Sequence, residues 1–323
     1  MSRLADRRVL VAGGAGFIGS HVVDWLLSLP GAEVTVFDNL ASGTLSRLEH
    51  HLSNPRLTFL QADLKDLDAL AGAMRGQAWV IHLASNPDIA KGMTDPSIDF
   101  WDGTYLTQNV LEAMRREGVR QLVYASGSGV YGEAGARPFA EDHGPLLPIS
   151  TYGASKLASE ALICAYASLF DLQAYVYRFA NVVGARQTHG VAYDFIRKLK
   201  RDPARLEIRG DGTQSKPYIH VSDIVAAIAH TVERAGDRFN VFNVATTDAL
   251  DVRQIADLVC RAMGVDGVRY DFTGGSRGWK GDVPVVRFDL SRIHSLGWRA
   301  ALGSAEAMQR SIAEMLSELQ PDG

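Results

Sequence analysis

Three glycines close to the N-terminus constrain this chain more than any other feature. They come directly after the apolar run 9–12, and they stand at Gly13, Gly16 and Gly19. The apolar residues that follow share one face of a helix: Ile18, Val22, Leu26 and Leu29. A glycine turn between a strand and a helix suits a pyrophosphate, because the backbone can approach the phosphates and free N–H groups of the helix face them. The sequence therefore predicts a dinucleotide-binding site at this turn.

The acid after the next strand indicates which dinucleotide is bound. The run 33–37 reads as that strand, and Asp38 follows it. A carboxylate at this place accepts hydrogen bonds from the adenine-ribose hydroxyls and repels a 2′-phosphate. We therefore expect NAD rather than NADP.

Strands and helices alternate through the first half of the chain. Helical patterns, including a long one from about 98 to 117, separate six strand candidates: 9–12, 33–37, 57–61, 79–83, 121–126 and 173–178. This alternation predicts an α/β fold, a Rossmann-type doubly wound parallel sheet with helices on both faces. Ligands bind outside the carboxyl ends of such strands. Asp63 and Leu64 should therefore lie near the adenine, and Leu83, Ala84 and Ser85 should run past the ribose and phosphates.

The pattern loosens after about residue 181, which predicts a second, smaller lobe. We expect a dinucleotide-binding domain over 1–180, with return segments near 218–247, and a substrate-binding lobe over 181–323. Helical patterns in this part lie at 191–200, 222–234, 252–263 and 304–319. A cleft between two lobes is the usual substrate site, so the substrate is expected there.

Composition excludes several classes of function. The chain has 323 residues, of which 46% are hydrophobic and 22% charged, and its formal net charge is −4, a profile typical of soluble globular proteins. The sequence has no basic stripe that would indicate nucleic-acid binding. No apolar run approaches the roughly 20 residues of a membrane span. The first six residues contain no apolar signal core, so a cytoplasmic location is expected. The histidines show no ligand spacing and His50-His51 reads as a surface turn, so no metal is expected; Cys164 and Cys260 read as buried small hydrophobes.

Tyr152 and Lys156 form the second motif that carries chemistry. They are four residues apart in a helical pattern, so they lie on one face, one turn from each other. A lysine ammonium near a phenol favours the phenolate and lowers the tyrosine pKa. Such a tyrosine can take a proton from a sugar or alcohol hydroxyl while hydride leaves the carbon, and the lysine can also hold the nicotinamide ribose. We therefore predict that this pair is catalytic.

These motifs together resemble the extended short-chain dehydrogenases/reductases of the nucleotide-sugar epimerase/dehydratase family, above all UDP-glucose 4-epimerases. The resemblance covers essentially the whole chain. The matching segments are Gly13–Gly19, Asp38–Leu40, Asp63-Leu64, His82–Ala84, Val130–Gly132, Tyr152 with Lys156, Arg178–Val182 and Tyr218–Asp223. The resemblance implies tightly held NAD, a nucleotide-diphosphate sugar, with a UDP-sugar favoured, and a homodimer formed through the helices near 98–117 and 152–169.

The resemblance also assigns roles to single residues. Cofactor contacts are implied for Gly13, Gly16, Phe17, Ile18, Gly19, Asp38, Asn39, Ser42, Gly43, Asp63, Leu64, Leu83, Ala84, Ser85, Tyr152 and Lys156. Substrate contacts are implied for Asn181 with the sugar or its phosphates, for Lys216 with the nucleotide or a phosphate, and for Arg277 with the diphosphate. Lys280 is the alternative to Arg277, because the spacing differs from the usual one.

Two positions depart from the family pattern. Gly127 stands where the family has a catalytic Ser or Thr whose hydroxyl contacts the sugar 4-oxygen. Either Ser126 or Ser128 replaces it through a shifted turn, with Ser128 favoured by the glycine on each side, or the tyrosine works with less help. Asp102 stands in a segment where paired asparagines are usual near the cofactor, and no role is carried over to it.

The residues after Gly127 also indicate which reaction of the family the chain catalyses. The resemblance implies an Asp-Glu pair after the catalytic Thr in 4,6-dehydratases, and a glutamate in this stretch in decarboxylases; Ser128 and Gly129 stand here instead. A 4-epimerase needs only the tyrosine, the lysine, bound NAD and room for a ketosugar to turn. We therefore predict a C4 epimerase of a UDP-sugar, of glucose/galactose or glucuronate type. Alternatives are a dehydratase, decarboxylase or reductase of the family, or a non-catalytic NAD sensor.

Overall fold

The computed structural model describes residues 2–133 and 137–319, and its contacts divide the chain into two compact units. The first unit comprises Met1–Gly132, Gly144–Arg178 and Ile228–Phe242. The second comprises Glu133–His143, Phe179–Ala227 and Asn243–Gly323. Each unit is described by itself below.

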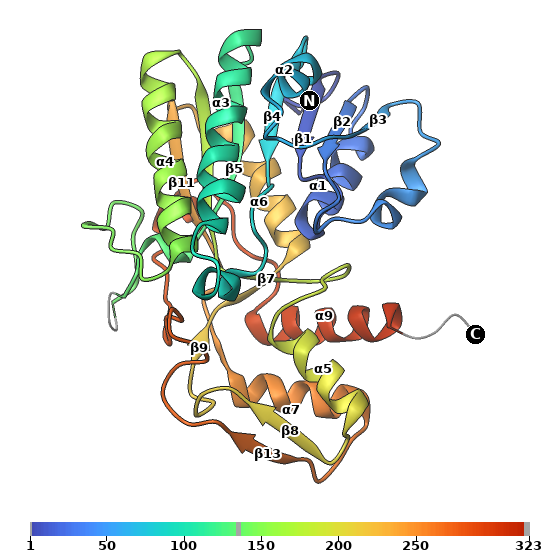
Figure 1. Cartoon of the computed structure of the whole chain (residues 1–323), viewed down its shortest axis with the longest axis vertical. Helices are drawn as coiled ribbons and strands as arrows, with labels where there is room; N and C mark the ends of the chain where they lie inside the picture. Colours follow the sequence, from blue (N-terminus) through green and yellow to red (C-terminus); the bar gives the residue numbers. More distant parts are fainter. Residues whose placement is uncertain (1, 134–136, 320–323) are drawn as a thin grey trace. The chain divides into compact units, whose positions relative to one another are not determined.

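The first unit is built on a seven-stranded sheet (Figure 1). Its strands are β1 (Arg8–Ala12), β2 (Glu33–Asp38), β3 (Leu57–Gln61), β4 (Trp79–His82), β5 (Gln121–Gly127), β6 (Gln173–Phe179) and β11 (Phe239–Val244). Their order is β11-β6-β5-β4-β1-β2-β3, and the pairs β1–β2, β1–β4, β2–β3 and β4–β5 are parallel. The order of the strands reverses at β1: β2 and β3 follow toward one edge of the sheet, and β4, β5 and β6 follow toward the other. A doubly wound sheet binds its ligand at this point, between β1 and β4. The predicted Rossmann-type fold is confirmed.

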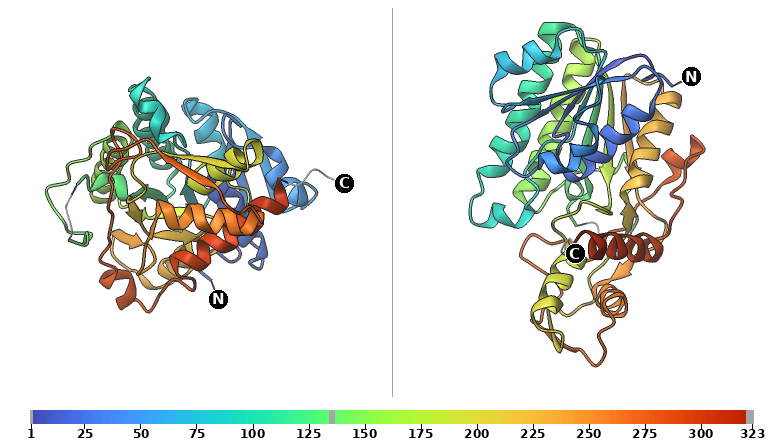
Figure 2. Two further views of the ribbon diagram at one scale, coloured as in Figure 1. Left: turned by 90° about the horizontal axis from the view of Figure 1, so that it is seen from below. Right: turned by 90° about the vertical axis from the view of Figure 1, so that its right-hand side faces the viewer.

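Helices cover both faces of this sheet. Those of the first unit are α1 (Phe17–Ser28), α2 (Leu67–Met74), α3 (Tyr105–Glu117), α4 (Thr151–Leu169) and the later part of α6 (Val221–Arg234). Figure 2 shows α2, α3 and α4 on one face and α1 and α6 on the other. Short 3₁₀ helices, η1 (Leu45–His51), η2 (Ile89–Met93) and η4 (Ser128–Val130), lie in the connections. The carboxyl ends of the strands therefore lie beside the loops that carry the predicted site residues.

The long helix expected from about 98 to 117 is divided. It begins as a π-helical turn, η3 (Phe100–Thr104), in which Asp102 has non-helical angles (φ −101°, ψ 16°), and α3 continues from Tyr105. A side chain at Gly103 would collide with the Ser155 hydroxyl of α4. Glycine at position 103 therefore allows this turn to approach α4 closely.

The second unit consists of a helical cluster and three small strand pairs. Its helices are α5 (Val191–Arg201), α7 (Val252–Met263), α8 (Ser291–Ser295) and α9 (Ser304–Glu318). Its pairs are β7 (Asn181–Val183) with β10 (Tyr218–His220), β8 (Arg205–Ile208) with β13 (Arg269–Phe272), and β9 (Ser215–Lys216) with β12 (Leu250–Asp251). The buried apolar faces of α5, α7 and α9 form its core with β8 and β10.

Apart from Phe179 and Ala180 at the boundary, three parts of the chain that the sequence assigned to the first domain group with the second unit: Glu133–His143, and residues 218–227 and 243–247 of the expected return segments. Residues 133–143 do so because Phe139 forms a bridge with Phe288 and exchanges backbone hydrogen bonds with Arg287 (2.9 Å) and Asp289 (2.8 Å). Asn243 donates to the Phe139 carbonyl at 2.8 Å. These pairings join segments that are far apart in the sequence, so no local sequence pattern predicts them.

A buried ion pair fixes α4 to the sheet. Glu160 on α4 accepts hydrogen bonds from the Arg178 guanidinium on β6, the shortest at 2.7 Å, and both side chains are only 5% exposed. The Ser126 hydroxyl on β5 donates to the same carboxylate at 2.5 Å, and the Arg178 guanidinium lies 4.8 Å from the centre of the Tyr131 ring. One carboxylate thus joins α4 to two strands, so the position of α4 on the sheet and its rotation about its own axis depend on it.

Glu160→Gln should destabilise the fold by roughly 3–5 kcal/mol, because it leaves the Arg178 charge buried without its counter-charge. Urea unfolding followed by circular dichroism measures this loss. The matched control is Asp194→Asn, which removes the partner of Lys198 in an i,i+4 pair on α5 whose carboxylate is 56% exposed; it should cost no more than about 0.5 kcal/mol. Equal losses for the two variants would contradict the role given to Glu160.

Candidate active site

The glycine loop between β1 and α1 has the geometry of a phosphate cradle. Gly13 has φ +83°, and a Cβ there would lie 2.8 Å from the backbone nitrogen of Ala84. A Cβ at Gly19 would collide with the Gly13 carbonyl oxygen. These two glycines are required by the fold itself, since no larger residue fits the turn or the packing of α1 against it.

Gly16 is glycine for a different reason. A Cβ there would meet one protein atom, the Gly13 carbonyl oxygen, at 3.1 Å, so packing alone tolerates a side chain better than at the other two positions. Gly16 is the N-cap of the 12-residue α1, which carries no acidic residue in its first turn. An anion placed before this helix end meets free N–H groups and the positive end of the helix dipole. The cradle therefore fits a pyrophosphate that passes over Gly16.

Asp38, at the end of β2, binds the backbone of the glycine loop between β1 and α1. It is 8% exposed, its Oδ2 accepts from the Ala15 backbone nitrogen at 2.9 Å, and its Oδ1 accepts from the Leu40 nitrogen at 2.8 Å. A Cβ at Gly43 would lie 2.9 Å from the Ala15 carbonyl, so the segment after Asp38 folds back against the glycine loop. Each carboxylate oxygen keeps a second acceptor direction, as the ribose role requires.

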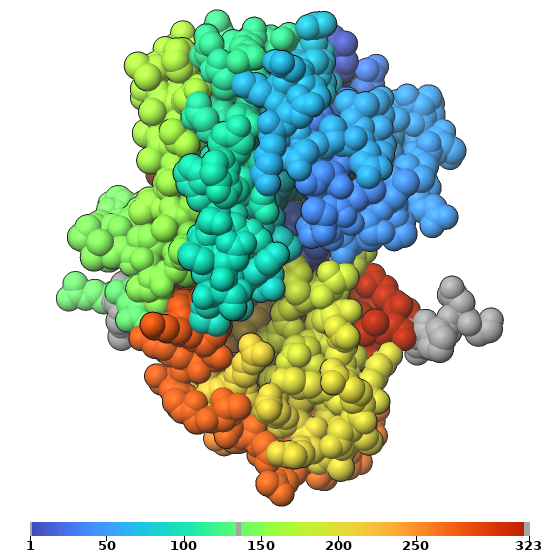
Figure 3. Space-filling view, in the orientation of Figure 1, coloured from blue at the N-terminus to red at the C-terminus, as the bar shows by residue number. Residues whose placement is uncertain are grey.

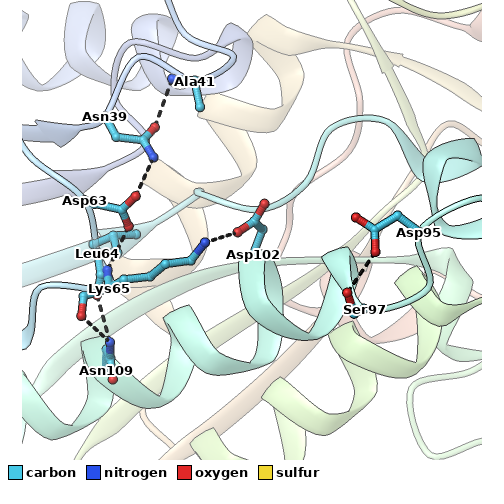
Figure 4. A network of polar contacts seen from close by, with 9 residues as sticks. All are labelled: Asn39, Ala41, Asp63, Leu64, Lys65, Asp95, Ser97, Asp102 and Asn109. Atoms are coloured by element: carbon cyan, nitrogen blue, oxygen red, sulfur yellow. Dashed lines mark hydrogen bonds and ion pairs between the residues drawn. The ribbon is translucent and has the colours of Figure 1, made fainter.

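The segments after β3 and β4 contact the same edge of the sheet as the glycine loop and Asp38. Asn39 donates to Asp63 Oδ2 at 3.0 Å, and Asn109 on α3 donates to the Leu64 carbonyl at 2.9 Å (Figure 4). The backbone nitrogens of Leu83 and Ala84 donate to the Ala12 carbonyl at 2.9 and 3.1 Å. The predicted cofactor positions on β1 to β4 are thus brought together by direct contacts at the carboxyl edge of the sheet.

Asp102, to which the family pattern assigned no role, is part of this network. It forms an ion pair with Lys65 at 2.7 Å (Figure 4), and this contact raises the pKa of Lys65. Lys65 follows the predicted adenine residues Asp63 and Leu64. The pair therefore ties the π-helical turn to the segment after β3.

Tyr152 and Lys156 lie at the start of α4, as the spacing predicts. The helix begins after Ser150, whose hydroxyl accepts from the Gly153 nitrogen at 3.1 Å. A Cβ at Gly153 would collide with the Gly129 carbonyl, so the helix start packs directly on the turn after β5. Lys156 is buried, donates to the Ala125 carbonyl at 2.7 Å, and its Nζ lies 5.6 Å from the centre of the Tyr152 ring.

The tyrosine pKa does not shift in the direction expected from the sequence. Burial, reinforced by the charge of Asp99, raises the pKa of Tyr152 to about 12. Burial lowers the pKa of Lys156 to about 8, against the charges of Glu160 and Asp99. Desolvation thus outweighs the effect of the ammonium and favours the phenol over the phenolate.

The two serines proposed to replace the missing hydroxyl lie in different surroundings. Gly127 ends β5 in an extended conformation (φ −165°, ψ 171°). Ser126 is 4% exposed and its hydroxyl is committed to Glu160. Ser128 is partly buried, and among the residues that the structure describes its hydroxyl has no hydrogen-bond partner. Of the two, Ser128 alone keeps a free hydroxyl.

The three predicted substrate residues lie in the second unit. Asn181 opens β7, where it stands opposite Tyr218 of the parallel neighbour β10. Arg277 pairs with Glu133 and also donates to the Asp282 carbonyl at 2.8 Å, and Lys216 pairs with the Asp282 carboxylate. Asp282 thus links the two cations, although they lie far apart in the sequence.

The His50-His51 turn holds a feature that the spacing did not suggest. Both rings direct Nε2 to one oxygen of Asp24, at 2.8 and 3.0 Å, and the three ligand atoms lie within 4.8 Å of one another. Hydrogen bonding to one carboxylate explains this arrangement. The side chains of His50 and Asp24 are 48% and 30% exposed.

Asp38→Ala should narrow the preference for NAD over NADP by at least ~10-fold, because it removes the acceptor for the ribose hydroxyls and the charge that opposes a 2′-phosphate. Fluorescence titration with both reduced cofactors measures the two affinities. Asp63→Ala is the control, since that carboxylate is assigned to the adenine end and should leave the ratio of affinities nearly unchanged. A wild-type protein that binds NADP as well as NAD would contradict the assignment.

No helix in the part of the chain that the structure describes is both long enough and apolar enough to cross a membrane.

Comparison with known proteins extends these observations. A model of the NAD dependent epimerase/dehydratase family matches residues 9–245. The UDP-glucose 4-epimerase of Mycolicibacterium smegmatis is 33% identical over 312 residues, which cover 94% of this chain and 97% of that protein. A dTDP-glucose 4,6-dehydratase of Streptomyces griseus is 30% identical over 310 residues, which cover 94% and 93% of the two chains.

Solved structures agree with this assignment. The crystal structure of a UDP-galactose 4-epimerase matches with a TM-score of 0.87 and 39% identity, over 97% of this chain and 100% of that chain. The UDP-glucose 4-epimerase of Thermus thermophilus, solved in complex with NAD, matches with a TM-score of 0.85 and 30% identity, over 97% and 100%.

Proposed function

Because this chain belongs to the NAD dependent epimerase/dehydratase family, we propose that it inverts C4 of a UDP-sugar through a transient 4-ketosugar. The sugar is a hexose or a hexuronic acid. The observation that carries this proposal is the Tyr152–Lys156 pair at the carboxyl edge of a dinucleotide-binding sheet, beside a turn that holds no acidic residue from 126 to 129. NAD is the cofactor, as in the family.

The chain's own residues move the proton. Bound NAD supplies the acceptor and donor of the hydride at C4, so that the sugar is oxidised and then reduced with no net redox change. Tyr152, as phenolate, takes the proton of the sugar 4-hydroxyl during oxidation and returns it during reduction. Lys156 stabilises that phenolate, since its ammonium lies one turn away on the same helix face.

The turn after β5 favours this reaction over elimination. A 4,6-dehydratase must move a proton at C5 and protonate the leaving oxygen at C6, which needs an additional acid and base. Ser128 and Gly129 offer neither a carboxylic acid nor a carboxylate. The dehydratase relative therefore fits this chain less well than the epimerases do.

The experiment is to incubate the purified protein with UDP-, GDP- and dTDP-sugars in deuterated water and to analyse the products by mass spectrometry and NMR. We expect a C4 epimer of a UDP-sugar that contains no solvent deuterium, with no net change in NADH. Tyr152→Phe should lower turnover at least ~10²-fold while NAD still binds, because it removes the general acid/base. Lys156→Ala should weaken both turnover and NAD binding.

Other products would contradict the proposal. A 4-keto-6-deoxy sugar, loss of carbon dioxide, or deuterium at C3 or C5 would indicate another reaction of the family. Consumption of added NADH would indicate a reductase. A Tyr152→Phe variant with near wild-type turnover would contradict the assignment of the base.

We propose that Arg277 and Lys216 bind the diphosphate, with Asn181 at the sugar or its phosphates. Arginine and lysine side chains suit phosphate, and both cations are here occupied by carboxylates, Glu133 and Asp282. A diphosphate must therefore compete with these carboxylates. The competition lowers the affinity that the cations would otherwise provide.

Glu133→Gln should tighten UDP binding by about twofold to fivefold, the range expected for removal of one exposed competing ion pair. Isothermal titration calorimetry with UDP measures the affinity. Asp271→Asn is the matched control, because it breaks the Arg205–Asp271 pair in the same unit and should leave UDP binding unchanged. Weaker binding by Glu133→Gln would mean that Glu133 helps to hold the nucleotide.

We also propose a homodimer formed through α3 and α4, which lie side by side at the surface of the first unit (Figure 3). Large apolar side chains are exposed at each end of this helix pair: Phe100 (50%) and Trp101 (49%) on η3 before α3, and Leu169 (72%) and Phe170 (43%) at the end of α4. Exposed apolar residues at both ends of the pair support an interface between proteins along it. Light scattering distinguishes a dimer from a monomer. The cytoplasmic location expected from the sequence stays a prediction.

A further inference from the structure

We propose that Asp99 positions Tyr152 and Lys156 by clamping the start of α4 to the chain that precedes η3. The proposal rests on the proposed function, because it concerns the same acid/base pair. Asp99 acts through these two side chains, so it is a positioning residue and not a catalytic one. It lies outside the segments that match the family pattern.

The Asp99 side chain is buried, yet it does not serve its own helix. Asp is a common N-cap residue, and Asp99 is the N-cap of η3, but its side chain makes no capping hydrogen bond there. It is 2% exposed, and among the residues that the structure describes no lysine, arginine or histidine forms an ion pair with it. Burying a carboxylate is costly unless hydrogen bonds satisfy it, so its partners indicate what it does.

Two hydrogen bonds of Asp99 go to the residues directly before Tyr152 and Lys156. The Thr151 hydroxyl donates to Asp99 Oδ2 at 2.6 Å, and the Ser155 hydroxyl donates to the Asp99 backbone carbonyl at 2.5 Å. Thr151 and Ser155 are four residues apart, so they lie on one face of α4. Two attachments on one face fix the rotation of the first turns about the helix axis. They therefore also fix the directions of the two side chains that follow them.

A third hydrogen bond of Asp99 joins α4 to the loop after β4. Asn86, 6% exposed, donates its side-chain amide to Asp99 Oδ1 at 2.9 Å, and its backbone nitrogen donates to the Asp102 carbonyl at 3.1 Å. This loop begins with the predicted cofactor residues 83–85. One carboxylate therefore links the cofactor side of β4 to the helix that carries the acid/base pair.

The clamp is closely packed. A Cβ at Gly92 on η2 would collide with the Thr151 hydroxyl and would lie 2.7 Å from Asp99 Oδ2. The Ser155 hydroxyl also accepts from the Thr104 hydroxyl on η3 at 3.0 Å. Contacts from η2 and η3 thus support the attachments to both residues of α4.

A clamp at the start of α4 adds to the contact that holds the helix farther along. The Glu160–Arg178 pair fixes α4 to the sheet roughly two turns after Tyr152. Helix ends fray, so an attachment at one point leaves the first turn less well defined. Displacing a reacting group by about 1 Å can cost on the order of 10²-fold in rate. The Asp99 clamp therefore acts where the acid/base pair is most sensitive to position.

The test compares Asp99→Ala, which removes the side-chain hydrogen bonds, with Asp99→Asn. The carboxamide keeps them, because it can accept from Asn86 and donate to the Thr151 hydroxyl. Fluorescence titration with NADH should show about fivefold weaker binding by Asp99→Ala, since Lys156 loses its position, and binding within about twofold of the wild type by Asp99→Asn. With NAD saturating, Asp99→Ala should lower kcat for the UDP-sugar at least ~10-fold and change KM less than about threefold.

Further variants separate positioning from a general loss of structure. Asp95→Ala is the matched control, because Asp95 is an exposed acid of the same segment that accepts from Ser97 at 2.8 Å (Figure 4); NADH binding and turnover should not change. In a Lys156→Ala background, Asp99→Ala should weaken NADH binding no further, because Asp99 acts through Lys156. Thr151→Val removes one of the same hydrogen bonds and should act in the same direction, so the test does not depend on the folding of Asp99→Ala.

Three results would overturn the proposal. Wild-type NADH binding and turnover by Asp99→Ala and Thr151→Val would mean that α4 needs no clamp. Binding by Asp99→Asn as weak as that by Asp99→Ala would assign the effect to charge and not to hydrogen bonds. An equal loss with and without Lys156 would indicate a general weakening of the fold. The NADH titration uses no sugar, so it decides this inference even if every UDP-sugar fails as a substrate.

Discussion

The structure depends on how α4 is held against the sheet. Charged groups are rarely buried, because desolvation is costly, and Glu160 and Arg178 are buried as a hydrogen-bonded ion pair. The Ser126 hydroxyl also donates to Glu160, so it is not available to a substrate at the turn after β5. The helix carries Tyr152 and Lys156, so the geometry of the acid/base pair and the loss of one candidate hydroxyl follow from the same buried contact.

A second constraint is electrostatic. The phenol and the ammonium are both enclosed, and burial alone raises the pKa of Tyr152 and lowers that of Lys156. Burial therefore drives each residue toward its neutral form, which opposes proton abstraction by the phenolate. Activation requires groups that favour the phenolate to outweigh burial and the Asp99 charge.

Local sequence patterns predicted the fold well and the site in part. The glycine spacing, the apolar runs and Tyr152 with Lys156 depend on short-range periodicity, and the strands from β1 to β6 formed within about one residue of the expected ranges. The partners of Ser126, Arg277 and Asp102 could not be predicted, since each partner lies in a distant segment. The pKa direction at Tyr152 was missed because burial is a property of the folded chain.

The most direct test of the account follows the hydrogen at C4. A UDP-sugar carrying deuterium at C4 is mixed with an unlabelled UDP-sugar of different sugar mass, and both epimers are analysed by mass spectrometry and NMR. The account predicts that deuterium stays at C4 of the labelled molecules through inversion, with none in water or in the unlabelled partner, because oxidation and reduction occur on one bound sugar. Loss of the label, or its transfer to the partner, would contradict inversion through a ketosugar retained in one active site.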